Sequence, residues 1–416
     1  MPMIAFFPWM QLRTPLREGR FHVFPVGHGH EMPDGVLRCV ELNAITKVLA
    51  QYRVSPTTGI AVHTLVEVDG HPIGTDLDEQ TRIELFAFAQ NLAVSSLASR
   101  RFTSNILDRP SCGGHYQLII QSFTEPYTGG TSIAYRRKGS WINVMMSGEA
   151  AKFFLPPHLV DRTHAPVDIG LLHALQNVGT LRGDLKERVR DSVAQFLVAN
   201  SDSPDIPSDA ESLATYAALE RLSGASQKLP DLQAKVADIL SAALAHPASN
   251  EVLQRLQIDA EQDTVRAWLA GLYKLRGHTG HGKPGDSAPK DWLQHDHLLA
   301  GAFVYALALK CLFYRHNLYR LRLEDVAHVL GLPLLLEDRP FFPATPAPDQ
   351  EAAVAAGEAA DLFGDPVPRG WMGGFHRVNK ALLEVELGRG ISAAIDESEQ
   401  LARPGVDQDG GSQSTS

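Results

Sequence analysis

In the first 165 residues, short apolar runs alternate with turn residues, which is the pattern of a strand-rich region. The β-prone runs between Gly, Pro and Asp turns are Gly59–Val68, Tyr116–Phe123, Thr131–Tyr135 and Ser140–Met146. The apolar start, Met1–Met10, predicts a first strand rather than a signal peptide, because no basic region precedes it and two prolines interrupt it. Apolar positions at helical spacing predict one helix within this region, at Asp78–Ser99.

From about residue 168 onward, apolar positions recur at helical spacing instead. The predicted helices are Asp184–Asn200, Ser208–Gln227, Leu232–Ala245, Asn250–Leu256, Asp263–Arg276 and Asp291–His316. The longest apolar run, Leu298–Leu309, is closed by Lys310 and falls short of the about 20 residues that span a bilayer. It therefore predicts a buried helix, and no association with a membrane is expected.

This change of pattern predicts an α+β multidomain protein. Residues 1–165 would form a β-rich domain of unknown specificity, with a possible sensor or regulatory role. Residues 168–340 would form an all-α antiparallel helical bundle. Residues 341–416 would be a linker and a partly disordered tail, because this stretch begins with a Pro-rich segment and ends in small polar residues.

Composition and charge limit the possible functions. The 416-residue chain carries a net charge of −10, so no global basic field attracts it to nucleic acid. An RNA-directed role would need a local basic patch or a partner that delivers the substrate. The three cysteines are far apart in sequence and give neither a disulfide framework nor a zinc-binding spacing, which favours a cytoplasmic protein.

The segment from Tyr273 to Lys283 carries the most informative chemistry. Arg276 and His281 lie five positions apart, at the end of an amphipathic helix. On a continuous helix they would point about 140° apart and would not share a face. Gly277 and Gly280 predict that the helix ends there, so that a Gly-rich loop to residue 287 can carry His281 back towards Arg276.

An arginine and a histidine brought together in this way suit phosphodiester cleavage. The guanidinium of Arg276 can clamp a phosphate and stabilise its developing charge. The imidazole of His281, with an ordinary pKa of about 6.5, can transfer a proton near neutral pH. The 2′-hydroxyl of RNA is a built-in nucleophile, so neither a metal nor a cofactor is expected. Lys274 and Lys283 add local positive charge for the RNA backbone.

Residues 272–282 read Leu-Tyr-Lys-Leu-Arg-Gly-His-Thr-Gly-His-Gly, which resembles the Apea-like branch of the HEPN superfamily. The resemblance covers roughly residues 180–320, including the helices before the motif. It implies a helical bundle that dimerises so that two motifs form one composite site. It also implies metal-independent RNA cleavage, often in toxin, abortive-infection or anti-phage defence systems. Many active members carry a polar residue after the arginine, where this chain has Gly277; His278 could supply that group.

Several alternatives remain open. The bundle could be a non-catalytic dimerisation module that binds nucleotide or RNA, or the chain could be an assembly or immunity partner. Arg276 could merely pair with a helix C-terminus, beside an exposed His281. Glu220 could orient either residue or could be a surface partner of Gln or Lys. A metal site would use the histidines of this region, namely His278, His281, His295 and His297, with Asp296.

Overall fold

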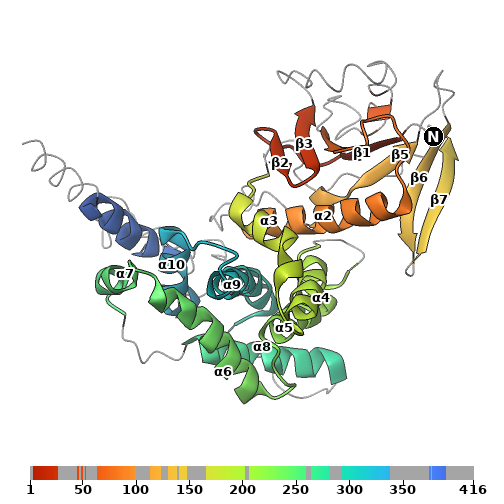
Figure 1. The fold of residues 1–416 in the computed structure, drawn as a ribbon. Coiled ribbons are helices and arrows are strands. Elements are labelled where there is room, and N and C mark those ends of the chain that lie inside the picture. The colour runs from red at the N-terminus through yellow and green to blue at the C-terminus, as the bar shows by residue number, and fades with distance from the viewer. Residues whose placement is uncertain are drawn as a thin grey trace, which may run out of the picture.

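The structure is a computed structural model (Figure 1), and it describes a set of ranges that together cover most of both halves of the chain. These ranges are residues 3–26, 45, 48–49, 52, 63–99, 113–122, 130–137, 140–147, 165–201, 206–258, 264–281, 292–337, 374–375 and 377–389. For residues 63, 122, 130–137, 140–147 and 278–281, only the backbone is described.

The N-terminal part is a seven-stranded sheet with the order β2-β3-β4-β1-β5-β6-β7, and all neighbouring strands are antiparallel. The strands are β1 (Met3–Phe7), β2 (Leu16–Glu18), β3 (Phe21–Val26), β4 (His63–Val68), β5 (Ile119–Ser122), β6 (Gly130–Arg137) and β7 (Ser140–Ser147). Each of the four predicted runs contains or overlaps one strand, and Met1–Met10 contains β1. The strands β2 and β3 were not predicted individually.

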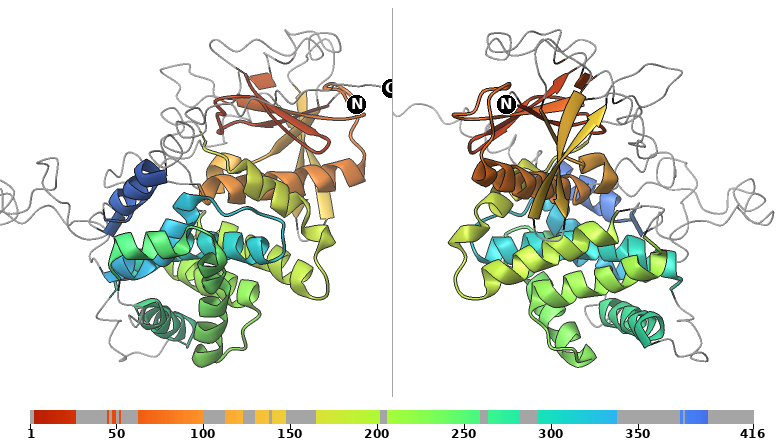
Figure 2. Two further views of the ribbon diagram at one scale, coloured as in Figure 1. Left: turned by 60° about the vertical axis from the view of Figure 1, so that its left-hand side comes forward. Right: turned by 90° about the vertical axis from the view of Figure 1, so that its right-hand side faces the viewer.

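One face of this sheet is covered by α2 (Glu79–Leu97), which matches the helix predicted in this region. The side chain of Asp78 caps the helix by accepting a hydrogen bond from the backbone N–H of Thr81 at 2.7 Å. Phe88 of α2 stacks on Phe21 of β3 with ring centroids 4.5 Å apart. Both views of Figure 2 place α2 between the sheet and the later helices.

The remainder of the described chain is mostly helical. Its helices are α3 (Ile169–Gln176), α4 (Leu185–Ala199), α5 (Ser208–Ser223), α6 (Leu229–Leu240), α7 (Ser249–Leu256), α8 (Thr264–His281), α9 (Gln294–Arg315), α10 (Leu323–Leu330) and α11 (Leu332–Glu337). Buried apolar side chains from the sheet, from α2 and from these helices form one continuous cluster. The mixed fold class is therefore confirmed, whereas the domain boundary stays a prediction.

The predicted end of the helix at Arg276 is wrong, because α8 continues through Gly277 and Gly280 to His281. A glycine inside a helix costs only about 1 kcal/mol relative to alanine. The preceding turns bury Trp268, Leu272 and other apolar side chains almost completely. The cost of each glycine is small enough for a helix already fixed by these turns to continue through both of them. The expected loop from Gly277 therefore does not begin there.

The central helix α9 is long and apolar enough to cross a membrane, but 83% of its apolar window is buried inside the protein. Ala300 to Phe313 lie almost entirely inside, on every side of the helix. This is the burial of a core helix, as its apolar run predicted, and it supports the expectation of a soluble protein. It also means that α9 does not offer an apolar face to a partner.

A C-terminal helix lies within the region that the sequence pattern assigned to the tail. Residues 377–389 are helical, and their apolar side chains Val378, Ala381 and Val385 are buried. Two ion pairs join this helix to α7: Arg255–Glu384 at 3.5 Å and Arg389–Glu251 at 3.0 Å. This part of the C-terminal region is therefore docked on the helical part of the protein.

Candidate functional site

The helix α8 presents one buried side and one exposed side. Its buried stripe consists of Trp268, Leu269, Leu272 and Leu275. Arg276 follows the last of these residues and is half-buried, at the edge of the buried side. Lys274 is exposed, as expected for a residue that would add positive charge at the surface. The amphipathic spacing that predicted the helix thus also fixes where these two cations lie.

The guanidinium of Arg276 makes cation–π contacts with two aromatic rings. Its Cζ atom lies 4.6 Å from the ring centroid of Tyr216 on α5 and 6.0 Å from that of Tyr273, one turn earlier on α8. The two rings are 6.0 Å apart and inclined by 58°. Distances of this size are those of attractive cation–π contacts. Arg276 is therefore held inside the bundle by rings, and it does not lie in a loop.

Glu220 lies near the pair formed by Tyr216 and Arg276, since its charge acts on the Tyr216 hydroxyl. Burial raises the pKa of the Tyr216 phenol above its ordinary value, and the negative charge of Glu220 raises it further. The positive charge of Arg276 acts in the opposite direction. Glu220 follows Tyr216 by one helical turn on α5, so the carboxylate considered for orienting Arg276 lies on the α5 side of this pair.

The other candidate residues lie at or beyond the end of α8. His278 and His281 belong to this helix, but their side chains lie outside the described residues, as does all of Lys283. Because the helix is continuous, positions 276 and 281 are about 140° apart around its axis. Within the described part of the chain, the residues that contact Arg276 are Tyr216 and Tyr273. Neither tyrosine was predicted as a site residue from the sequence.

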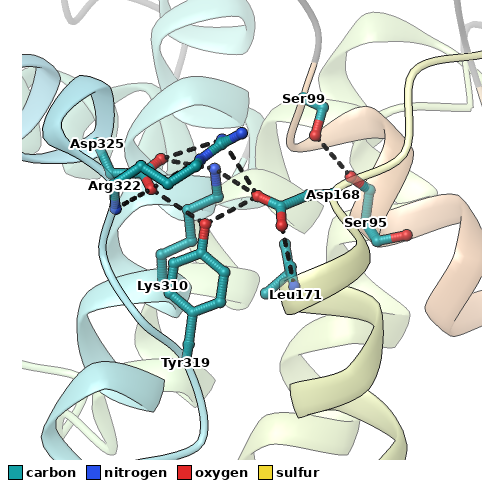
Figure 3. Close-up of polar contacts among 8 residues, drawn as sticks. All are labelled: Ser95, Ser99, Asp168, Leu171, Lys310, Tyr319, Arg322 and Asp325. Carbon is teal, nitrogen blue, oxygen red and sulfur yellow. Dashed lines mark hydrogen bonds and ion pairs between the residues drawn. The ribbon is translucent and has the colours of Figure 1, made fainter.

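A second polar cluster, which the sequence analysis did not predict, lies between α3, α9 and α10 (Figure 3). It consists of Asp168, Lys310, Tyr319, Arg322 and Asp325, and we call it the Lys310 cluster. Lys310 and both carboxylates are almost completely buried, whereas the side chain of Arg322 is 51% exposed. Charges buried to this degree are stable only with close partners.

The ammonium of Lys310 is held between the two carboxylates, 3.0 Å from Asp168 and 2.7 Å from Asp325. Arg322 lies 3.2 Å from Asp168 and 3.3 Å from Asp325, so two cations balance two anions. The hydroxyl of Tyr319 lies between both carboxylates, at 2.9 and 3.0 Å, and can donate to either. Burial alone would raise the pKa of Asp325, but Lys310 and then Arg322 lower it to about 2.

The Lys310 cluster is a closed structural network. Asp168 also caps α3 by accepting a hydrogen bond from the N–H of Leu171 at 3.0 Å, so the cluster ties the start of α3 to α9 and α10. The one signal in the sequence was a lysine at the end of an apolar run. Its carboxylate partners lie 15 residues away along the chain for Asp325 and much farther for Asp168, so sequence spacing could not identify them.

The histidines proposed as an alternative metal site are partly described. His297 is fully buried, with its ring centroid 6.0 Å from that of Trp268 and 6.1 Å from that of Trp292. His295 is about half exposed and lies 3.3 Å from Asp296. Within the described ranges, no group of three or more metal-ligand side chains comes together.

Comparison with known proteins assigns no family. No protein-family model matches the chain, and neither a curated protein nor a solved structure matches it significantly.

Proposed function

We propose that the helical part is a HEPN-like, metal-independent endoribonuclease in which Arg276 binds the scissile phosphate and His281 transfers a proton. The observation that carries the proposal is the position of Arg276, half-buried on the ring of Tyr216 at the edge of α8. A guanidinium held by cation–π attraction still has N–H groups to donate. Those N–H groups are the donors that grip a phosphate in a forked geometry.

The continuous helix favours a dimer as the active form. Side chains about 140° apart on one helix do not converge on one phosphate. A two-fold axis beside α8 would bring two copies of the motif face to face, so that Arg276 of one chain could act with His281 of the other. We therefore propose a homodimer through the helical part, with RNA as substrate and with Lys274, His278 and Lys283 contacting its backbone.

We further propose that this nuclease is a cytoplasmic effector in toxin, abortive-infection or anti-phage defence. In this scheme the N-terminal sheet senses a trigger and controls the helical part. The continuous buried cluster that joins the sheet, α2 and the helices provides a physical path for such control.

The decisive experiment is RNA cleavage with EDTA present, comparing wild-type protein with Arg276→Ala and His281→Ala. We expect both substitutions to abolish cleavage, and the wild-type products to carry 2′,3′-cyclic phosphate ends. His316→Ala and Arg190→Ala are matched controls, because both residues are exposed and lie on other helices or their ends. Full activity in a folded Arg276→Ala or His281→Ala variant would refute the catalytic assignment.

The second candidate function is a non-catalytic module that binds RNA or nucleotide. The glycine at position 277 favours it, because many active members carry a polar residue there. The net charge of −10 favours its dimerisation form, because it weakens the attraction to RNA. This candidate predicts a folded dimer that binds RNA without cleaving it, and binding that is weakened by Arg276→Ala.

A further inference from the structure

The contact between Arg276 and Tyr216 joins two helices. Tyr216 is 1% exposed, so its ring is fixed by the packing of α5 within the bundle. Arg276 comes from α8 and is only half-buried. The rigid partner is therefore the ring, and the long arginine side chain is the group whose conformation the contact restricts.

We infer that Tyr216 is the positioning residue for Arg276, and that its aromatic face holds the guanidinium where the phosphate of RNA binds. This inference rests on the proposed function. An arginine side chain loses much rotamer freedom when it binds a phosphate. A side chain already held on a ring has lost part of that freedom before the substrate arrives, which leaves less to lose on binding.

The ring, rather than the hydroxyl, performs this role. Within the described part of the chain, the buried Tyr216 hydroxyl has no partner in good hydrogen-bond geometry, and the nearby Arg276 side chain acts to lower its pKa. Burial and the nearby Glu220 both raise the pKa of this phenol, so it stays neutral and is a poor proton donor or acceptor near neutral pH. Removing the hydroxyl should therefore preserve the contact, whereas removing the ring should abolish it.

Glu220 defines the side from which the phosphate approaches. Its charge acts on the Tyr216 hydroxyl from the α5 side of the pair. A carboxylate there disfavours a phosphate on the same side, because like charges repel strongly at short range in a partly buried site. The side of Arg276 that faces away from Glu220 remains the favourable approach.

The test compares kcat for RNA cleavage in wild type, Tyr216→Phe and Tyr216→Leu. We expect Tyr216→Phe to retain activity within about two-fold, since the π face persists. We expect Tyr216→Leu to lower kcat by about 10- to 100-fold, because a displacement of about 1 Å in a catalytic group has that effect. Tyr305→Leu is the control, because Tyr305 is an equally buried tyrosine of the bundle that contacts Phe196 of α4 and lies outside the proposed site; it also loses a hydrogen bond with Ser192, which makes it the harsher change. This control should keep the wild-type kcat when folded.

A double-mutant comparison separates positioning from general destabilisation. If Tyr216 acts through Arg276, adding Tyr216→Leu to the Arg276→Lys variant should lower its residual kcat by no more than about two-fold. Three results would each overturn the inference alone. The first is wild-type kcat in Tyr216→Leu, and the second is a loss of kcat in Tyr216→Phe as large as that in Tyr216→Leu. The third is a loss of kcat on adding Tyr216→Leu to Arg276→Lys as large as the loss it causes in the wild-type background. An inactive wild-type dimer would instead overturn the proposed function, and the inference with it.

Discussion

Replacing Lys310 with methionine should strongly destabilise the protein, because two buried carboxylates would lose their common cation. Lys310 lies 3.0 Å from Asp168 and 2.7 Å from Asp325, and all three side chains are at most 5% exposed. Methionine preserves most of the aliphatic volume, so the change mainly removes charge. The perturbation therefore tests the electrostatics of the cluster rather than its packing.

The expected loss is about 3 kcal/mol, the lower end of the about 3–5 kcal/mol found when one partner of a buried ion pair is removed. The lower end applies because Arg322 still faces both carboxylates at 3.2 and 3.3 Å. The lowered pKa of Asp325 gives an independent figure of similar size. A pKa of about 2 against the ordinary 3.8 corresponds to about 2 kcal/mol of stability above pH 4.

The pH dependence follows from the same shift. The folded-state pKa of Asp325 lies below its unfolded value, so its contribution is present above pH 3.8 and is lost as the pH falls towards 2. Without Lys310 the folded-state pKa of Asp325 should rise. The stability difference between wild type and Lys310→Met should therefore be largest near neutral pH and should narrow as the pH falls below about 4.

The assay is urea unfolding followed by tryptophan fluorescence at pH 7 and at low pH. Arg17→Met is the control for an exposed pair, because Arg17 and Asp69 are 64% and 49% exposed, and it should cost less than about 1 kcal/mol. The double variant Lys310→Met/Asp325→Asn restores charge balance and should recover part of the loss. A Lys310→Met midpoint equal to that of wild type at pH 7 would refute this account of the cluster.

Two further predictions concern single positions in the helices. Within the described part of the chain, a Cβ added at Gly277 would meet no atom within 4 Å, so Gly277→Ala should stabilise α8 by about 1 kcal/mol in urea unfolding at low protein concentration. A lowered midpoint would contradict this, since it would require another surface to pack on that position. Burial lowers the pKa of His328, so folding should weaken as the pH falls below about 6.5, where the unfolded histidine takes up a proton. His328→Leu should flatten that slope between pH 7.5 and 5.5, and an unchanged slope would assign the dependence to other groups.

Local periodicity was sufficient to predict most of the elements. In the strands β4 to β7 and in the helices α2 and α4 to α9, the apolar residues that the fold buries recur at the spacing of their element. That spacing can be read from a short stretch of sequence. The helices α3, α10 and α11 were missed; each has at most eight residues, so a helical period repeats only about twice, although α7, with eight residues, was predicted. The same applies to β2, which has three residues.

The end of α8 could not be predicted because it depends on competing energies. The two glycines at positions 277 and 280 favour termination locally, whereas the packing of the preceding turns favours continuation. Sequence spacing shows the glycines but not the neighbours that bury the helix. Arg276 was singled out as a candidate site residue from its motif, but its neighbour Tyr216 lies on another helix, and only the fold brings the two together.

Arg276 and the Lys310 cluster hold their positive charges in opposite ways, and this difference bears on the proposed function. Lys310 and Arg322 are neutralised by two carboxylates at 2.7–3.3 Å, so they stabilise the fold and have little charge left for a ligand. The contacts that the structure shows for Arg276 are with the π faces of Tyr216 and Tyr273. A π face attracts a guanidinium without cancelling its charge. Arg276 is thus held in place with its charge still available to an anion, as the proposed contact with an RNA phosphate requires.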